Sequence, residues 1–339
     1  MMKNLFDYAT KELSQDAFLR WLFENYNCEN ESVKNTCRKL FDSFTKNKFK
    51  EKAITDLTTV AQWKNIDISI WFKIDGIEQL IVIEDKTGSG IHDDQLAKYE
   101  KEIIGHNDFW RNEENRKRYN IERYIEKGGN VFKVFYKTNI IDEWEAKHTE
   151  GLGWKTYDIY SIYNLFKDIE TDNEVLGYYI DYIKNIYSSA RREQSPSEWG
   201  LISWHSFFND YHTLVCISEE KEINCYRKEY YYIKFFVKGH EKDLPCFEIR
   251  SRDFKFDKSS GKCSIVVRAV LYNLTEQANA GSIEAWQQSL KKYGFSLNHK
   301  TDINKHKQIG KICFGNIDDD EEALKKTFDK INSLLSSLF

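Results

Sequence analysis

The stretch from Asn65 to Lys86 reads NIDISIWFKIDGIEQLIVIEDK, and it decides the fold that the sequence predicts. An isoleucine or phenylalanine stands at every second position from 66 to 72, which is the period of a β-strand. Residues 80–86 form an apolar run that ends in charge, as in a central strand buried on both faces. Asp75-Gly76 between the two runs is a typical turn of a β-hairpin. We therefore expect two antiparallel strands, 66–74 and 80–86.

Charged residues stand at the ends of these two strands. Asp67 begins one, and Glu84 and Lys86 share a face at the end of the other, so the hairpin brings both carboxylates together. Two buried carboxylates repel, and Mg²⁺ relieves the repulsion because it prefers oxygen ligands and retains waters. Lys86 would add a positive charge where phosphate charge develops. The alternative is a structural salt bridge of Lys86 with one carboxylate.

The residues around the hairpin predict an α/β domain with a mixed sheet flanked by helices. A short helix carries Gln95 and Tyr99, and the charged segment 111–118 is an exposed loop or helix. Ser14 is the predicted N-cap of the first helix. The other predicted helices are 14–26, 32–44, 160–166 and 174–190, and the other strands are 57–63, 131–137 and 154–159.

The composition of the sequence changes after residue 190, which predicts a second domain. The segment Arg191–Glu198 contains Ser195-Pro196-Ser197 and marks the boundary, so the domains are 1–190 and 191–339. The second has aromatic-rich strands between helices and is an α+β domain. Its predicted helices are 199–211, 282–293 and 319–335, and its strands are 230–237, 246–250, 264–271 and 311–314.

Charge is unevenly distributed along the chain. The net charge is −4 overall, but residues 1–190 hold 27 Lys and Arg against 33 Asp and Glu, whereas residues 221–311 hold 18 against 10. A basic region of this size is suited to phosphate contacts. Arg250 and Arg252 flank Ser251, so we expect them to share a strand face and reach adjacent phosphates. The alternatives are a solvated surface, or a surface that pairs with another protein or a second copy of the chain.

Composition also excludes several classes of protein. The chain of 339 residues has seven cysteines and no C-x-x-C pair, so we expect free thiols rather than disulfides or a zinc site. It has no apolar run of about 18 residues, and its first residues lack the apolar stretch of a signal peptide. A cytoplasmic protein that does not cross a membrane is expected.

Three motifs in order resemble the PD-(D/E)XK nuclease superfamily. The first is the helix ELSQDAFLRWL, residues 12–22; the second is Ile66-Asp67 with Glu84-Asp85-Lys86; the third is DQLAKY, residues 94–99, which looks like a Q-x-x-x-Y helix. The resemblance spans residues 5–137. Ile66 replaces the eponymous proline, a departure that leaves the metal chemistry intact.

The resemblance implies a role for each matched residue. Asp67 and Glu84 would ligate Mg²⁺, for which Mn²⁺ could substitute, with the Asp85 main-chain carbonyl as a further ligand. Lys86 would orient or activate the water. Gln95 and Tyr99, one helical turn apart, would steady the site or a substrate phosphate. Glu12 matches an acidic residue near the metal, and Asp16 competes for that role.

The function expected from this resemblance is phosphodiester hydrolysis of nucleic acid, with DNA favoured over RNA. A role in restriction or defence against phage rests on family analogy. The second domain would select the target or bind a partner. The chain could also form a homo-oligomer. The alternative is a catalytically inactive module of the same fold that binds nucleic acid or a protein. A small-molecule phosphate enzyme is disfavoured because the chain lacks a phosphate-binding glycine motif.

Overall fold

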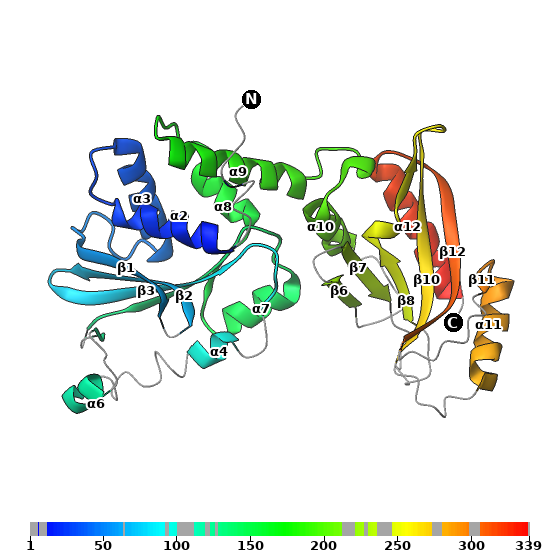
Figure 1. The fold of residues 1–339 in the computed structure, drawn as a ribbon, viewed down its shortest axis with the longest axis horizontal. Helices are drawn as coiled ribbons and strands as arrows, with labels where there is room; N and C mark the ends of the chain where they lie inside the picture. Colours follow the sequence, from blue (N-terminus) through cyan, green and yellow to red (C-terminus); the bar gives the residue numbers. More distant parts are fainter. Residues whose placement is uncertain are drawn as a thin grey trace. The chain divides into compact units, whose positions relative to one another are not determined.

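The structure is a computed structural model, and it divides into two compact units, Met1–Ser188 and Ser189–Phe339 (Figure 1). The sequence analysis placed the boundary between residues 190 and 191. Each unit is described by itself. The described residues are 6, 12–63, 65–91, 95–99, 112–118, 123–125, 128–211, 221–226, 230–235, 246–272, 280–297 and 306–337.

The first unit is built on a mixed five-stranded sheet of order β1-β2-β3-β4-β5. The first three strands are antiparallel, while β4 runs parallel to β3 and β5 runs parallel to β4. This confirms the predicted α/β class. The strands are β1 (Thr55–Trp63), β2 (Ile66–Ile74), β3 (Ile77–Lys86), β4 (Val131–Lys137) and β5 (Lys155–Tyr157).

The predicted hairpin between β2 and β3 is confirmed. Asp75 and Gly76 have φ angles of 51° and 79°, the left-handed conformation that a two-residue hairpin turn of type I′ requires. Ile74 therefore pairs directly with Ile77, and β3 begins earlier than predicted. The same register pairs Ile68 with Ile83 at the far end of the hairpin.

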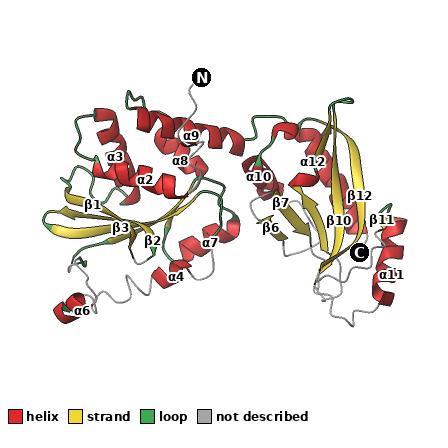
Figure 2. Ribbon diagram, in the orientation of Figure 1, coloured by secondary structure: helices red, strands yellow, loops and turns green. Residues whose placement is uncertain are grey.

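Helices cover both faces of this sheet (Figure 2). On one face, Phe41 of α3 contacts Phe72 of β2 edge to face, with ring centroids 4.8 Å apart. On the other face, Leu96 and Tyr99 of α4 belong to a cluster with Phe135 of β4. The helices of this unit are α2 (Glu12–Glu24), α3 (Glu31–Phe44), α4 (Gln95–Tyr99), α6 (Glu113–Arg118), α7 (Glu143–Gly151), α8 (Ile159–Phe166) and α9 (Glu174–Ala190).

Other elements of this unit also differ from the prediction. Ser14 does not cap the first helix, because α2 already begins at Glu12. The strand predicted to reach residue 159 ends at Tyr157, since the Asp158 carboxylate accepts a hydrogen bond from the Ser161 amide and caps α8. Helix α7 was not predicted, and Asp142 caps its first turn.

The second unit is an antiparallel sheet of order β11-β12-β10-β8-β7-β6, with β9 paired to β10. Helix α12 contributes Leu324, Phe328 and Ile331 to the core beneath this sheet. The strands are β6 (Lys221–Tyr226), β7 (Tyr230–Phe235), β8 (Cys246–Arg250), β9 (Lys255–Asp257), β10 (Lys262–Tyr272), β11 (Ser296–Leu297) and β12 (His306–Asp318). The helices are α10 (Leu201–Tyr211), α11 (Ala280–Lys292) and α12 (Glu321–Ser337).

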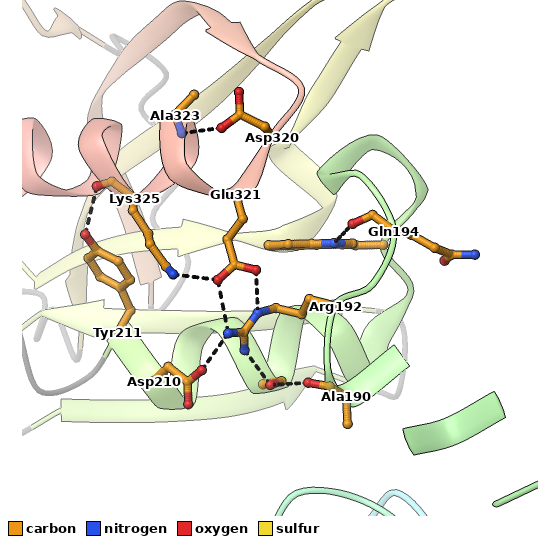
Figure 3. A network of polar contacts seen from close by, with 11 residues as sticks. Ala190, Arg192, Gln194, Asp210, Tyr211, Asp320, Glu321, Ala323 and Lys325 are labelled. Atoms are coloured by element: carbon orange, nitrogen blue, oxygen red, sulfur yellow. Dashed lines mark hydrogen bonds and ion pairs between the residues drawn. The ribbon is translucent and has the colours of Figure 1, made fainter. Parts of the chain in front are cut away.

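A half-buried arginine, Arg192, joins the segment before α10 to helix α12 within the second unit (Figure 3). The Arg192 guanidinium donates to both Glu321 carboxylate oxygens over 2.9 and 3.1 Å. It also donates to Ser206 Oγ at 2.6 Å and lies 2.7 Å from Asp210 Oδ2. The Arg192 side chain is 12% exposed and that of Glu321 25%, so this pair is better shielded from solvent than the contact with Asp210, which is 56% exposed. The segment Arg191–Glu198, which was predicted to mark the domain boundary, is therefore part of the second unit.

We expect Arg192→Met to lower the free energy of unfolding by about 2–3 kcal/mol, because it removes several hydrogen bonds between charged groups. Urea denaturation of the full chain measures this change. The matched control is Arg191→Met, since Arg191 is the exposed neighbour and its loss should change stability by less than about 0.5 kcal/mol. Equal changes in the free energy of unfolding for the two substitutions would contradict a stabilising role of the Arg192 network.

Candidate functional site

The two predicted carboxylates lie side by side on β2 and β3. The ladder pairs Ile68 with Ile83, so Asp67 and Glu84 are the next residues beyond the last paired position. Oδ2 of Asp67 accepts a hydrogen bond from the Asp85 amide at 2.9 Å, and Oδ1 accepts one from Gln62 Nε2 at 3.1 Å. Glu84 is fully buried and the Asp67 side chain is 16% exposed. The pair is therefore held at one end of the hairpin, with Asp67 as its more exposed member.

The Lys86 side chain joins both carboxylates. Lys86 lies two residues beyond Glu84 and so shares its face of the strand. Its Nζ donates to Glu84 Oε1 and, over 3.1 Å, to the Asp85 main-chain oxygen. The same Nζ lies 3.7 Å from Asp67 Oδ2. One ammonium group thus faces two carboxylates, which leaves the cluster with excess negative charge when all three groups are ionised.

The donor atoms of this cluster fit a hard divalent cation. Oε2 of Glu84 is buried without a hydrogen-bond partner among the described residues. The carboxylates of Asp67 and Glu84 and the Asp85 carbonyl form an all-oxygen set, which Mg²⁺ prefers and completes with waters. Across the described ranges, no three His, Cys, Asp or Glu side chains gather as metal ligands. A cation here would therefore depend on these two carboxylates, one carbonyl and water.

The electrostatics of Glu84 reflect its surroundings. Burial raises the pKa of its carboxyl to about 7; the Lys86 ammonium opposes this rise and the Asp67 carboxylate adds to it. The protonated form of Glu84 is therefore readily accessible near neutral pH in the protein without a cation.

Gln95 and Tyr99 lie together on α4, as their spacing predicts. Gln95 Nε2 donates to the Tyr99 hydroxyl at 2.8 Å, and that hydroxyl donates to the Asn65 main-chain oxygen at 2.7 Å. Burial and the nearby Glu84 carboxylate raise the pKa of Tyr99. These contacts fix the backbone directly before β2, so the two residues brace the position of Asp67.

The Asp85 side chain points away from this cluster, to the α2 face of the sheet. Its Oδ1 accepts a hydrogen bond from Gln15 Nε2. Burial raises the pKa of the Asp85 carboxyl well above its usual range, and the Asp16 carboxylate raises it further. Asp16 is itself 6% exposed, whereas the side chain of Glu12 lies outside the described part of the structure. The contact between α2 and β3, in which Gln15 takes part, was not predicted.

The arrangement predicted for Arg250 and Arg252 is wrong. Strand β8 ends at Arg250, and Ser251–Asp253 form a 3₁₀ turn, so the two arginines do not alternate along one strand. The Arg250 guanidinium donates to Glu248 Oε2 over 2.8 and 2.6 Å. Glu248 is 2% exposed, so this arginine neutralises a buried carboxylate of its own unit. It is therefore not a pre-formed phosphate contact.

We expect the metal-free protein to lose stability as pH rises through about 7, because the folded state favours the protonated Glu84 carboxyl and the unfolded chain does not. The stabilisation is complete below the ordinary pKa of glutamate and amounts to on the order of 3 kcal/mol. Urea unfolding in EDTA from pH 5 to 8 measures it. Glu84→Gln should flatten this part of the profile and be the more stable form at pH 8; parallel profiles would contradict the expectation.

Comparison of the chain with known proteins finds no relative. No model of a known protein family matches the chain, and no curated protein or solved structure matches it either. Within the described ranges, no helix combines the length and apolar character needed to cross a membrane. What the cluster around Glu84 does has to follow from its own contacts and charges.

Proposed function

We propose that the first unit is a magnesium-dependent nuclease domain of the PD-(D/E)XK type that hydrolyses phosphodiester bonds in nucleic acid, with DNA favoured as substrate. The observation that supports this most is the convergence of Asp67, Glu84 and Lys86 at the ends of two neighbouring strands. Three charged side chains, largely withdrawn from solvent, cost free energy, and a catalytic role explains why they are kept together.

The architecture of the first unit supports the same proposal. A helix layer precedes three antiparallel strands, and a crossover containing α4 leads to the parallel strand β4. This is a mixed sheet flanked by helices, as the sequence resemblance implies. Glu84 and Lys86 lie at the end of β3, where Lys86 pairs with Lys137 of β4, and Asp67 lies beside them on β2.

Each residue of the cluster has a chemical task in this proposal. The Asp67 and Glu84 carboxylates and the Asp85 carbonyl would hold Mg²⁺, which polarises a phosphoryl oxygen and makes a bound water more acidic. Lys86 would stabilise the negative charge that develops on the phosphate as the water attacks. Gln95 and Tyr99 would keep the Asn65 backbone, and with it Asp67, in place.

The structural salt bridge remains a competing explanation, because Lys86 already contacts both carboxylates. A salt bridge needs only one carboxylate for one ammonium, whereas this cluster has two and leaves Glu84 Oε2 unused. The excess negative charge favours a cation site. Affinity for divalent cations therefore separates a nuclease from an inactive module of the same fold.

We expect Lys86→Ala to lower the cleavage rate by roughly 10²–10³-fold, as the loss of one electrostatic donor typically does. The assay is cleavage of circular and linear DNA with Mg²⁺ or Mn²⁺, in which cutting of the circle demonstrates endonuclease action. Lys73→Ala is the matched control, because Lys73 lies on β2 and pairs with the exposed Asp56. Cleavage by Lys86→Ala at the wild-type rate would remove this residue from the mechanism.

We also expect Asp67→Asn and Glu84→Gln to weaken Mg²⁺ binding, since each keeps the side-chain shape and removes one negative charge from the donor set. Isothermal titration calorimetry measures the change. Asp75→Asn is the control, because it removes an exposed carboxylate at the opposite end of the hairpin and asparagine tolerates its positive φ. Unchanged affinity in both site variants would make the carboxylates structural.

A further inference from the structure

A second lysine–glutamate pair lies beside the proposed metal site. Lys137 is the last residue of β4, and its Nζ lies 2.8 and 2.6 Å from the two carboxylate oxygens of Glu145 on α7. Each side chain is only 3% exposed. A buried pair of this kind gains little net stability over apolar residues of similar size, so its presence calls for another explanation.

The sheet places Lys137 next to the residues of the proposed site. In the parallel ladder of β3 and β4, Lys137 pairs with Lys86, and Phe135 pairs with Glu84. Neighbouring strands are about 4.8 Å apart, and paired residues project from the same face. Lys137 is therefore a diagonal neighbour of Glu84 on one face, and its four-carbon stem can span a strand spacing.

The Lys137 ammonium is bound to Glu145 and not to the Glu84 carboxylate. A buried ammonium without a partner is costly and would turn to any carboxylate in reach. Glu84 offers such an acceptor, because its Oε2 has no hydrogen-bond partner among the residues that the structure describes. An ammonium on Oε2 would occupy the atom that the proposed site leaves open for a cation.

The position of Glu145 is itself tightly fixed. Its amide donates to Asp142 Oδ1 at 2.8 Å, and its Oε2 accepts from the Asp142 amide at 3.3 Å, which forms a capping box. Gly90, in the loop that follows Lys86, lies so close that a Cβ there would be 3.3 Å from Glu145 Oε1. The carboxylate is thus clamped between the first turn of α7 and the loop after β3.

We propose that Glu145 is a positioning residue for the metal site: it binds Lys137 and thereby keeps Glu84 Oε2 available to a divalent cation. This inference rests on the proposed function of the first unit. It also explains the cost of the buried pair, because Glu145 protects a ligand rather than adding stability.

The test is calorimetric titration of Mg²⁺ and Mn²⁺ into the full-length variant Glu145→Gln. Glutamine can keep the capping box while losing the charge that holds Lys137. We expect affinity to fall roughly 10–100-fold, the usual effect of removing an outer-shell partner. Glu143→Gln is the matched control, because Glu143 lies on the same helix in an exposed pair with Lys147 at 2.5 Å. The affinity of this control variant for Mg²⁺ and Mn²⁺ should equal that of the wild type.

Removal of the competing ammonium separates positioning from simple loss of structure. The double variant Lys137→Met/Glu145→Gln should regain the wild-type affinity, and Lys137→Met alone should retain it even if its melting temperature falls. Weak binding by the double variant, or wild-type affinity in Glu145→Gln, would overturn the inference. If Glu145→Gln does not fold, Lys137→Met decides: unchanged affinity supports the inference and a tenfold loss overturns it. A wild-type protein that binds neither cation overturns the proposed function, and the inference with it.

Discussion

The two-residue turn at Asp75 and Gly76 fixes the register of β2 against β3, and the rest of the first unit depends on that register. Side chains alternate between the faces of a strand, so a shift by one residue would turn Asp67 to the opposite side of the sheet from Glu84. It would also exchange the side chains that β2 presents to the two covered faces, so that Ile68 and Ile70 would lie on the side where Ser69 and Trp71 now pack. A short local turn thus decides both which side chains each face of the sheet receives and whether the two carboxylates meet.

The same end of the sheet concentrates charge that the fold would be more stable without. Glu84 is fully buried, and Lys86 and Lys137 are nearly so, on adjacent strands. The ammonium groups are divided between partners: Lys86 faces Glu84 and Asp67, whereas Lys137 is taken by Glu145. This uneven pairing leaves net negative charge at Asp67 and Glu84. A structural ion pair would avoid such an excess, whereas a cation site requires it.

The strands of the first unit could be predicted because their signal is local. Alternation from Ile66 to Phe72 and the Asp75-Gly76 turn depend on residues close in sequence, and the observed β2 has the predicted bounds. Helix α7 escaped prediction because the residues that it buries include Glu145 and Thr149, which are polar and give no apolar period. The sequence signals of this helix are polar: the capping box that Asp142 and Glu145 form, and the pair of Glu143 with Lys147 one turn on. The pairing of Lys137 with Glu145 depends on how β4 aligns with β3, which no local pattern contains. The end of β8 at Arg250 was predicted, and the strand-face argument for Arg250 and Arg252 failed because it carried strand alternation beyond that end into the 3₁₀ turn Ser251–Asp253.

The Arg192 network bears on how such a protein can be assembled in evolution. The guanidinium belongs to a segment that leads into α10, yet its carboxylate partner Glu321 begins the helix α12 far along the chain. A gene fusion that joined the second unit to a different neighbour after Arg192 would remove the guanidinium that binds both Glu321 carboxylate oxygens and leave Lys325 as the remaining cation of this network. A junction that keeps this network intact therefore has to lie upstream of Arg192. The few residues before Arg192 are therefore the place where a gene fusion could have joined the second unit to a different protein.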